Sequence, residues 1–408
     1  MPRGDDRIRR FYLFRAVTSF SLWIPFWTLW VYKNLDSVFL MTVVDAAFWV
    51  TMIAFQIPAG LLGDKYGRKA VLFAGEITYA VGVFSFGMST GFSQYLFSNI
   101  VWAIGVCFIV SGDTPYVYDL LLEFRRSGEF TKVMGTANAV MYVMNAVAVV
   151  VGGLIVQETD HLEYTLLIAS VIGFMGSFTI LALKEPKVDK REMASYRTQF
   201  KAGIKRILWS RPILILVLFQ IVVEIGIYVM AVFRSVYMND YLDLSYLEIG
   251  LFFSSFAIVG GIVTRKADKV DETLGERRAL FFMYAAIFGS FIVVFLVASP
   301  AAIITQYLIY MVAGLNYPII NGYINKRVES STRSTVMSIA SFMFTGILTV
   351  VEVAAGWVAT YWGLKTSLLI LAVGTAPISI YLLVLWTREL DKESAARVKY
   401  QRVLKDMT

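Results

Sequence analysis

Cysteine and histidine are almost absent from this 408-residue sequence, which contains one of each. The single cysteine, Cys107, cannot form an intrachain disulfide, and one thiol cannot supply the ligands of a structural metal site. The single histidine, His161, likewise excludes a histidine-based metal cluster. We therefore expect no metal site, and we interpret Cys107 as a helix-packing residue and His161 as an exposed loop residue.

Charged residues are also scarce, at 16% of the chain against about 25% in soluble proteins, while hydrophobic residues reach 58%. Such an excess of apolar residues cannot be buried in a water-soluble core, so the composition excludes a soluble enzyme and a disordered scaffold. With roughly 20 apolar residues per crossing, the chain has room for about a dozen helices. The composition predicts an all-α membrane protein.

The sequence has no phosphate-binding loop of the form Gly-x-x-x-x-Gly-Lys-Ser/Thr. We therefore expect an ion gradient, and no cofactor, to drive any transport that the protein performs. The net charge of +7 does not by itself indicate a nucleic-acid partner, because the distribution of Lys and Arg among the loops matters more in a membrane protein.

Twelve apolar runs are long enough to cross a membrane. They fall at residues 9–31, 37–62, 70–90, 94–122, 132–157, 164–183, 212–237, 245–264, 279–298, 301–325, 335–360 and 366–387. All but four of the 37 Lys and Arg residues lie on one side of this arrangement. The exceptions are Arg15, Lys33, Arg234 and Lys365. The positive-inside rule then predicts a multi-pass protein of the cytoplasmic membrane with both termini in the cytoplasm.

A polar stretch between the sixth and seventh runs divides the chain into two halves. We predict a six-helix half over 1–184, a cytoplasmic linker over 185–211, a second six-helix half over 212–387 and a cytoplasmic tail over 388–408. Within the linker, apolar residues recur at three- and four-residue spacing, which indicates an amphipathic helix on the inner leaflet. They are Met193, Tyr196, Phe200, Ile204 and Ile207.

Residues 60–69 read Gly-Leu-Leu-Gly-Asp-Lys-Tyr-Gly-Arg-Lys and follow the second run. This segment resembles the cytoplasmic loop signature of the major facilitator superfamily, Gly-x-Leu-Ala-Asp-x-x-Gly-Arg-Arg/Lys, with Gly63 at the alanine position. A weaker repeat follows the eighth run, from Gly260 to Arg278. The resemblance implies twelve transmembrane helices in two pseudo-symmetric halves and secondary transport by alternating access.

The same resemblance implies a role for the motif at the inner face. Asp64 is expected near the start of the eleventh span, where a carboxylate is favoured by the helix dipole. Arg68 is expected to reach Asp119 at the inner end of the fourth span. Such a charge cluster would act as a clamp that holds one of the alternating states. The set of motif and clamp residues is Gly60, Asp64, Gly67, Arg68, Lys69 and Asp119.

We single out six ionisable residues as lying well within the predicted spans: Arg15, Asp45, Asp113, Glu224, Arg234 and Glu352. Exposing all of them to lipid would cost on the order of 15 to 20 kcal/mol on insertion scales. They are therefore expected to face a cavity or one another. Similar depth on the first and fourth spans suggests that Arg15 pairs with Asp113, as a structural ion pair or as a site that exchanges partners.

Glu224 lies near the middle of the seventh span and shares one helical face with Gln220 and Tyr228. A carboxylate at this depth is a candidate proton carrier or cation-binding group, and the alternative is a permanent packing contact. By family resemblance the tenth span also lines the central path. Asn316 and Asn321 on that span are the candidate polar neighbours.

Two further groups are candidates. Asp45, Arg234 and Glu352 lie toward the outer side and could form an outer gate or pack within one half. Trp23, Phe26 and Trp27 surround Pro25 on the first span and could form an aromatic wall for an apolar or cationic substrate, or anchor the helix at the membrane interface.

These observations predict proton-coupled export of an amphipathic or drug-like compound by a monomer. The alternative is proton- or sodium-coupled uptake of a polar metabolite, which would bind Gln220, Asn316 and Asn321. A sensor that does not transport is a more remote alternative. The fifth span keeps Gly152 and Gly153 but lacks the Gly-Pro kink that is common in proton-coupled exporters of the family, which weakens the export hypothesis.

Overall fold

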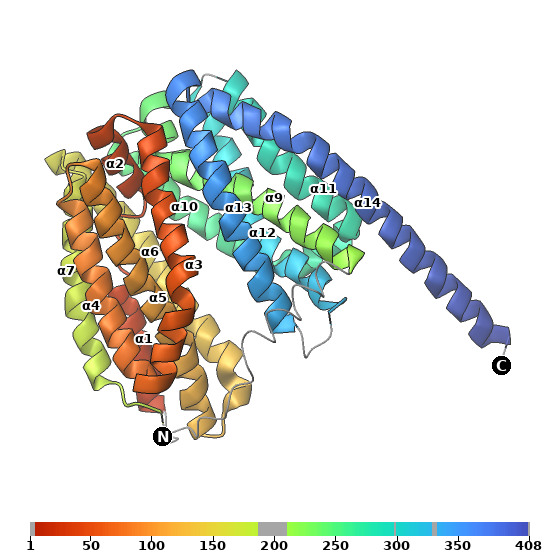
Figure 1. The fold of residues 1–408 in the computed structure, drawn as a ribbon, viewed down its shortest axis with the longest axis horizontal. Helices are drawn as coiled ribbons and strands as arrows, with labels where there is room; N and C mark the ends of the chain where they lie inside the picture. Colours follow the sequence, from red (N-terminus) through yellow and green to blue (C-terminus); the bar gives the residue numbers. More distant parts are fainter. Residues whose placement is uncertain (1–4, 187–209, 298, 329–332, 407–408) are drawn as a thin grey trace. The chain divides into compact units, whose positions relative to one another are not determined.

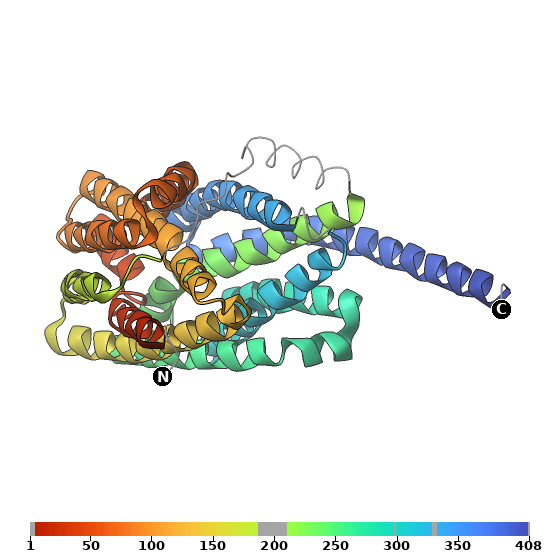
Figure 2. The ribbon, with the colours of Figure 1, turned by 90° about the horizontal axis from the view of Figure 1, so that it is seen from below.

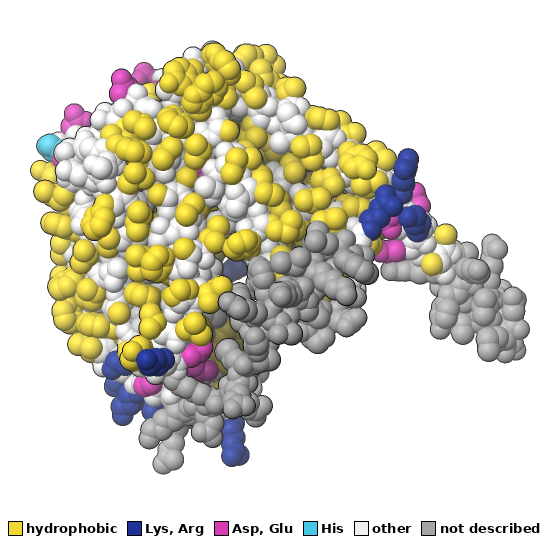
Figure 3. Space-filling model, in the orientation of Figure 1, with side chains coloured by type: hydrophobic (Ala, Val, Ile, Leu, Met, Phe, Trp, Pro, Cys, Tyr) yellow, Lys and Arg dark blue, Asp and Glu magenta, His cyan; other side chains and the backbone are white. Residues whose placement is uncertain are grey.

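The computed structural model describes residues 5–186, 210–297, 299–328 and 333–406. In these residues all regular structure is helical and no strand occurs (Figure 1). Within the described ranges, eleven helical segments are long and apolar enough to cross a membrane. Hydrophobic side chains cover most of the described face in Figure 3, and the Lys and Arg side chains in this view gather at its lower edge and at the base of the C-terminal extension. The chain is an all-α, multi-pass membrane protein, as its composition predicts.

The helices follow the predicted runs closely. Those of the first part are α1 (Asp5–Thr18), α2 (Trp27–Leu35), α3 (Val38–Tyr66), α4 (Arg68–Gly87), α5 (Phe92–Glu123), α6 (Phe130–Thr159) and α7 (Glu163–Ser177). Those of the second part are α9 (Arg211–Val236), α10 (Tyr246–Arg265), α11 (Ala267–Leu296), α12 (Ile304–Asn325), α13 (Arg333–Trp362) and α14 (Leu364–Asp406). Short helical turns extend several of them, including a π-helical turn at Tyr237–Tyr241 after α9.

The first predicted span is not one continuous helix. It is broken between α1, which ends at Thr18, and α2, which begins at Trp27. Pro25 lies in this interval; it has no N–H to donate and it disfavours the helical conformation at the preceding residue. The turn is closed instead by hydrogen bonds from the backbone N–H groups of Phe26 and Trp27 to the carbonyl of Trp23. The prediction of an unbroken helix over 9–31 was therefore wrong.

The segments that follow the two predicted halves are the linker and the C-terminal tail, and the structure describes mainly the tail. α14 continues from the last span through Asp406, so the predicted tail is a helical extension of that span. The predicted amphipathic segment of the linker lies outside the described residues.

Backbone contacts group the chain into two compact units. Unit 1 comprises Met1–Glu192, Ala231–Ile258 and Thr349–Leu364, and unit 2 comprises Met193–Met230, Val259–Leu348 and Lys365–Thr408. Unit 1 therefore contains the first six predicted spans together with one end of α9, α10 and α13.

In unit 1, α4 and α5 form the most extensive helix pair (Figures 1 and 2). Glycines on both helices make this close approach possible. A Cβ atom at Gly82 would lie 2.5 Å from the backbone nitrogen of Trp102, and one at Gly105 would collide with the backbone of Tyr79. The pairing therefore fixes the aromatic residues Tyr79 and Trp102 beside each other.

The part of α13 in unit 1 packs against α3 in a regular antiparallel register. Near the start of α3, the backbone N–H of Phe39 donates to Thr360 Oγ1 at 2.8 Å. One turn along, Gly356 lies so close to Thr42 that a Cβ atom would overlap the threonine side chain. A further turn along, the carboxyl groups of Asp45 and Glu352 meet. This three-step contact is called the α3–α13 ladder below.

Unit 2 is organised around α9, the most thoroughly buried of the candidate spans. Gly226 of α9 packs against Ile287 and Phe288 of α11. α11 is interrupted at Gly275, whose φ of 69° lies in the left-handed region that favours glycine. The weak sequence repeat at 260–278 thus contains a real helix break.

Candidate functional site

Glu224 on α9 is the centre of a polar cluster in unit 2. Its Oε1 atom accepts hydrogen bonds from Gln220 Nε2 at 2.8 Å and from Asn316 Nδ2 at 3.1 Å. Both donors are neutral amides, so these two hydrogen bonds bring no positive charge to the carboxyl group. The one-turn spacing of Gln220 and Glu224 on α9 permits the first contact, and α12 supplies the second.

Three buried amides retain unused hydrogen-bonding capacity: Gln220 and Asn316, which bond to Glu224, and Asn321, which lies further along α12. Gln220, Asn316 and Asn321 are 8%, 3% and 5% exposed. The side-chain oxygens of Gln220 and Asn316, and both polar atoms of the Asn321 side chain, have no hydrogen-bond partner in the described residues. Buried polar atoms without partners are costly, so these three amides are suited to a ligand or water that supplies the missing contacts. Tyr228, one turn further along α9, packs on Phe344, with ring centroids 5.2 Å apart.

Arg15 of α1 and Asp113 of α5 form a buried ion pair in unit 1, with Nη1 and Oδ2 2.8 Å apart. A second guanidinium nitrogen, Nη2, donates to the sulfur of Met141 at 3.3 Å. The Nε atom of Arg15 and Oδ1 of Asp113 are buried and find no partner among the residues that the structure describes. The pair is therefore incompletely satisfied.

Glu76 of α4 was not among the ionisable residues singled out from the sequence. It is 3% exposed and interacts electrostatically with both Arg15 and Asp113. The signal was present, because Glu76 is an acid inside the predicted span 70–90. The site thus contains two carboxyl groups and one cation rather than a simple pair.

An aromatic cavity of about 220 Å³ lies in unit 1. It is lined by Trp23, Trp27, Asp45, Phe48, Trp49, Tyr79, Asn99, Trp102 and Val106. Trp23 donates its indole N–H to the Tyr79 hydroxyl at 3.0 Å and meets Trp102 edge-on at 4.6 Å between ring centroids. Two of the three predicted aromatic-wall residues line the cavity. The third, Phe26, is fully buried elsewhere against Tyr246.

Asp45 and Glu352, two of the predicted outer-gate residues, meet at the α3–α13 ladder. Asp45 Oδ2 accepts a hydrogen bond from the indole N–H of Trp49 at 3.0 Å. Glu352 is 0% exposed, and neither of its carboxyl oxygens receives an N–H or O–H group from the described residues. The third gate residue, Arg234, lies with its guanidinium 5.6 Å from the centre of the Phe253 ring.

The loop motif forms a compact charge cluster at the junction of α3 and α4. Arg68 contacts Asp64 through Nη2 at 2.6 Å and Asp119 through Nε at 3.3 Å. A Cβ atom at Gly63 would lie 2.9 Å from the same guanidinium group, which explains why glycine suits this position. Gly67 ends α3 with φ of 99°, and Gly60 faces open space.

Glu185, which follows α7, completes this cluster and was not foreseen. Its two carboxyl oxygens accept the backbone N–H groups of Arg68 and Lys69 at 2.6 and 2.8 Å. These donors are the free N–H groups at the start of α4, so the carboxylate caps the helix and complements its dipole. Lys69 also reaches the carbonyl of Leu181 at 2.9 Å. Glu185 and Arg68 are too far apart in sequence for any local pattern to link them.

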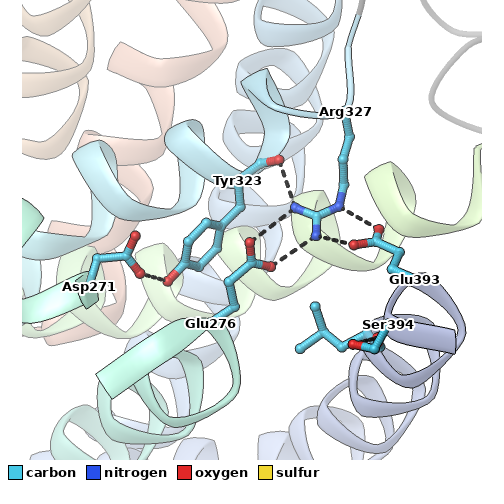
Figure 4. A network of polar contacts seen from close by, with 7 residues as sticks. Asp271, Glu276, Tyr323, Arg327, Glu393 and Ser394 are labelled. Atoms are coloured by element: carbon cyan, nitrogen blue, oxygen red, sulfur yellow. Dashed lines mark hydrogen bonds and ion pairs between the residues drawn. The ribbon is translucent and has the colours of Figure 1, made fainter. Parts of the chain in front are cut away.

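Unit 2 contains a comparable network at the break in α11 (Figure 4). Arg327 contacts Glu276 at 3.0 Å and Glu393 of α14 at 2.9 Å, and its guanidinium lies over the Trp386 ring at 4.7 Å. Tyr323 donates a hydrogen bond to Asp271. The network ties α11, α12 and α14 together at one end.

A multi-pass helical protein with ionisable clusters and an aromatic cavity inside its spans has the features of a secondary transporter. A family model described as Major Facilitator Superfamily matches residues 11–351. The chain belongs to this superfamily of transporters.

Two curated relatives are similar over part of the chain. Multidrug resistance protein 2 of Bacillus subtilis (strain 168) is 27% identical over 162 residues, which are 39% of each chain. Quinolone resistance protein NorA of Staphylococcus aureus (strain MSSA476) is 21% identical over 217 residues, covering 53% of this chain and 52% of NorA. The matches thus span well under two thirds of either relative.

A solved structure of a mutant of the nucleoside transporter NupG resembles the fold over nearly its whole length. The TM-score is 0.78 at 12% sequence identity, and the match covers 94% of this chain and 100% of that chain. At this identity the likeness establishes the shared fold.

Proposed function

We propose that the protein is a proton-coupled exporter of an amphipathic or drug-like compound in the cytoplasmic membrane. The observation that carries this proposal is Glu224, a carboxyl group inside a span that is bound by neutral amides rather than by a cation. A group in this setting can take up and release a proton without breaking an ion pair. The names of the two curated relatives favour export of drug-like compounds.

The proposed mechanism is alternating access between two six-helix halves, residues 1–184 and 212–387, that act as a monomer. Both termini and the linker 185–211 are placed in the cytoplasm on the strength of the Lys and Arg distribution. In this orientation the α3–α13 ladder lies toward the outer face. The contact between Gly153 of α6 and the Tyr246 carbonyl of α10 would close the same end, because a Cβ atom at Gly153 would lie 2.7 Å from that oxygen.

Uptake of a polar metabolite is the second candidate, and the amides near Glu224 favour it. The unpartnered atoms of Gln220, Asn316 and Asn321 could bind the hydroxyl or amide groups of a polar substrate. The structural likeness to a nucleoside transporter is compatible with this alternative.

Transport by purified protein in liposomes with an imposed pH gradient would separate the two candidates. Lipophilic drugs, nucleosides and sugars are presented in turn, and the internal pH is followed with a trapped dye. Export predicts that a lipophilic compound moves against the direction of proton flow. Proton-driven movement of a nucleoside or sugar in the direction of proton flow would instead support uptake.

A further inference from the structure

α7 carries a stripe of exposed apolar side chains that continues into the short 3-10 helix Phe178–Ala182. The members of the stripe recur at three- and four-residue spacing, so they share one face. They are Val171, Phe174, Met175, Phe178 and Leu181, all of which are exposed. Their spacing and exposure are those of a surface that contacts lipid chains.

The end of this stripe binds two cationic side chains from other helices. Arg10 Nη1 of α1 donates to the carbonyl of Ala182 at 2.8 Å, and Lys69 Nζ of α4 donates to the carbonyl of Leu181 at 2.9 Å. Consecutive residues supply the two acceptors, so a guanidinium and an ammonium group meet at one turn. Each uses one donor in these contacts and retains others for a ligand.

These two cations have no acidic partner among the described residues. Neither Arg10 nor Lys69 forms an ion pair with a described carboxylate. Glu185 belongs to the same region, but its two carboxyl oxygens accept the N–H groups at the start of α4. The turn therefore offers hydrogen-bond donors and positive charge to a ligand that carries negative charge.

We propose that this site binds an anionic phospholipid, with one phosphodiester group between Arg10 and Lys69 and the acyl chains along the stripe on α7. The Lys and Arg distribution puts this end of the spans at the inner leaflet, where anionic lipids attract basic residues. Guanidinium and ammonium groups both bind phosphate oxygens. The proposal rests on the proposed orientation of the chain, and it is independent of the transported compound and the coupling ion.

The apolar stripe identifies a lipid, rather than a free phosphate ion, as the occupant. Leu181 joins the two parts of the site, because its carbonyl accepts from Lys69 and its side chain is the exposed end of the stripe. A lipid contacts both parts at once, whereas a free ion contacts only the cations. Salt also screens the attraction between a free ion and exposed charges.

Native mass spectrometry of the purified full chain in detergent tests the proposal. Dioleoylphosphatidylglycerol and dioleoylphosphatidylcholine are added in turn, and bound lipid is measured against lipid concentration. The acyl chains are identical and only the headgroup charge differs, so the anionic lipid should bind about tenfold more tightly or better. Glycerol 3-phosphate, which has no acyl chains, should not displace it. Equal binding of the two lipids, or displacement by glycerol 3-phosphate, would overturn the proposal.

Matched variants locate the site. Arg10→Gln and Lys69→Gln should each weaken phosphatidylglycerol binding about fivefold and leave phosphatidylcholine binding unchanged. Arg10→Lys keeps the charge and should keep most of the affinity, which separates the charge from the packing of the arginine side chain. Lys132→Gln removes an exposed cation at the start of α6 and should have no effect. An equal loss in Lys132→Gln, or no loss in Arg10→Gln and Lys69→Gln, would indicate diffuse attraction and refute the site. The assay involves no transport, so such a result would leave the proposed function standing.

Discussion

At the residue scale, the polar groups inside the spans differ in what neutralises them. Glu224 is bound by amides, Arg15 faces two carboxyl groups, and Asp45 faces a second acid. Because a charge in the membrane interior is costly, replacing the ionisable residue by a neutral one should affect the protein differently in each of these arrangements. Two substitutions test this directly.

Glu224→Gln should abolish substrate accumulation driven by a pH gradient while leaving substrate exchange partly intact. Glutamine can still bond to Gln220 and Asn316, but it cannot carry a proton. Transport in vesicles with and without a gradient measures both activities. Glu158→Gln, at an exposed position, is the control for loss of an acid. Accumulation with unchanged pH dependence in Glu224→Gln would rule out the proton-carrying role.

Neutralising Arg15 should destabilise the protein more than neutralising Asp113. Breaking a buried pair typically costs about 3 to 5 kcal/mol. Asp113→Asn leaves Glu76 to face Arg15, whereas Arg15→Gln leaves two carboxyl groups without their cation. The double variant should recover much of the melting temperature lost by Arg15→Gln. A double-mutant cycle on melting temperatures measures the coupling, and strictly additive losses would contradict it.

At the element scale, helix locations could be predicted from the sequence, but most helix pairings could not; the exception is the contact marked by the ion pair of Arg15 with Asp113. Runs of apolar residues identify the spans because the bilayer fixes their length. The apolar run alone does not show that the chain turns near Pro25 and separates α1 from α2, instead of forming one kinked helix. The meeting of Asp45 with Glu352 depends on the register of α3 against α13, and no local pattern encodes that register. The cap that Glu185 places on α4 is equally non-local.

The close approach of α13 to α3 should depend on Gly356. Gly356→Ala should destabilise the protein by about 1 to 3 kcal/mol, because the added methyl group overlaps Thr42. Gly346→Ala on the same helix is the matched control, since a Cβ atom there meets nothing within 4 Å. It should be neutral or slightly stabilising, because alanine is the better helix former. Thermal unfolding in detergent compares the two, and equal melting temperatures would argue against the ladder.

At the scale of the whole molecule, the motif cluster could be foreseen only because it resembles a family signature. Arg68 contacts both Asp64 and Asp119, the two carboxylates that the resemblance groups with it in one charge cluster. The position of Glu76 along the chain marks it as an acid inside a span, but it does not reveal that Arg15 and Asp113 of other helices are its electrostatic neighbours. The family signature therefore identifies the motif cluster, whereas the positions of ionisable residues within apolar runs identify the candidate sites inside the spans.

Weakening this cluster should shift the balance between transport states. Asp64→Asn removes the closest ion-pair partner of Arg68, at 2.6 Å. If the cluster holds the cytoplasmic side shut, the population should move toward the inward-facing state. A cysteine introduced at Tyr118, with Cys107 replaced by serine, should then label faster from the cytoplasmic side. Asp36→Asn is the control, and an identical labelling rate in Asp64→Asn would exclude the clamp.

The continuous helix α14 has a mechanical consequence. Its 43 residues correspond to about 65 Å at about 1.5 Å per residue, roughly twice the thickness of the hydrocarbon layer. Arg327 and Arg277 bind its acidic residues Glu393 and Asp391, so the emerging part is fastened to unit 2 near its base. Because α14 is one long helix, a small tilt of its membrane-spanning part would become a large displacement at its C-terminal end. A fluorescent label placed there would make tilting of that span visible as a change in distance.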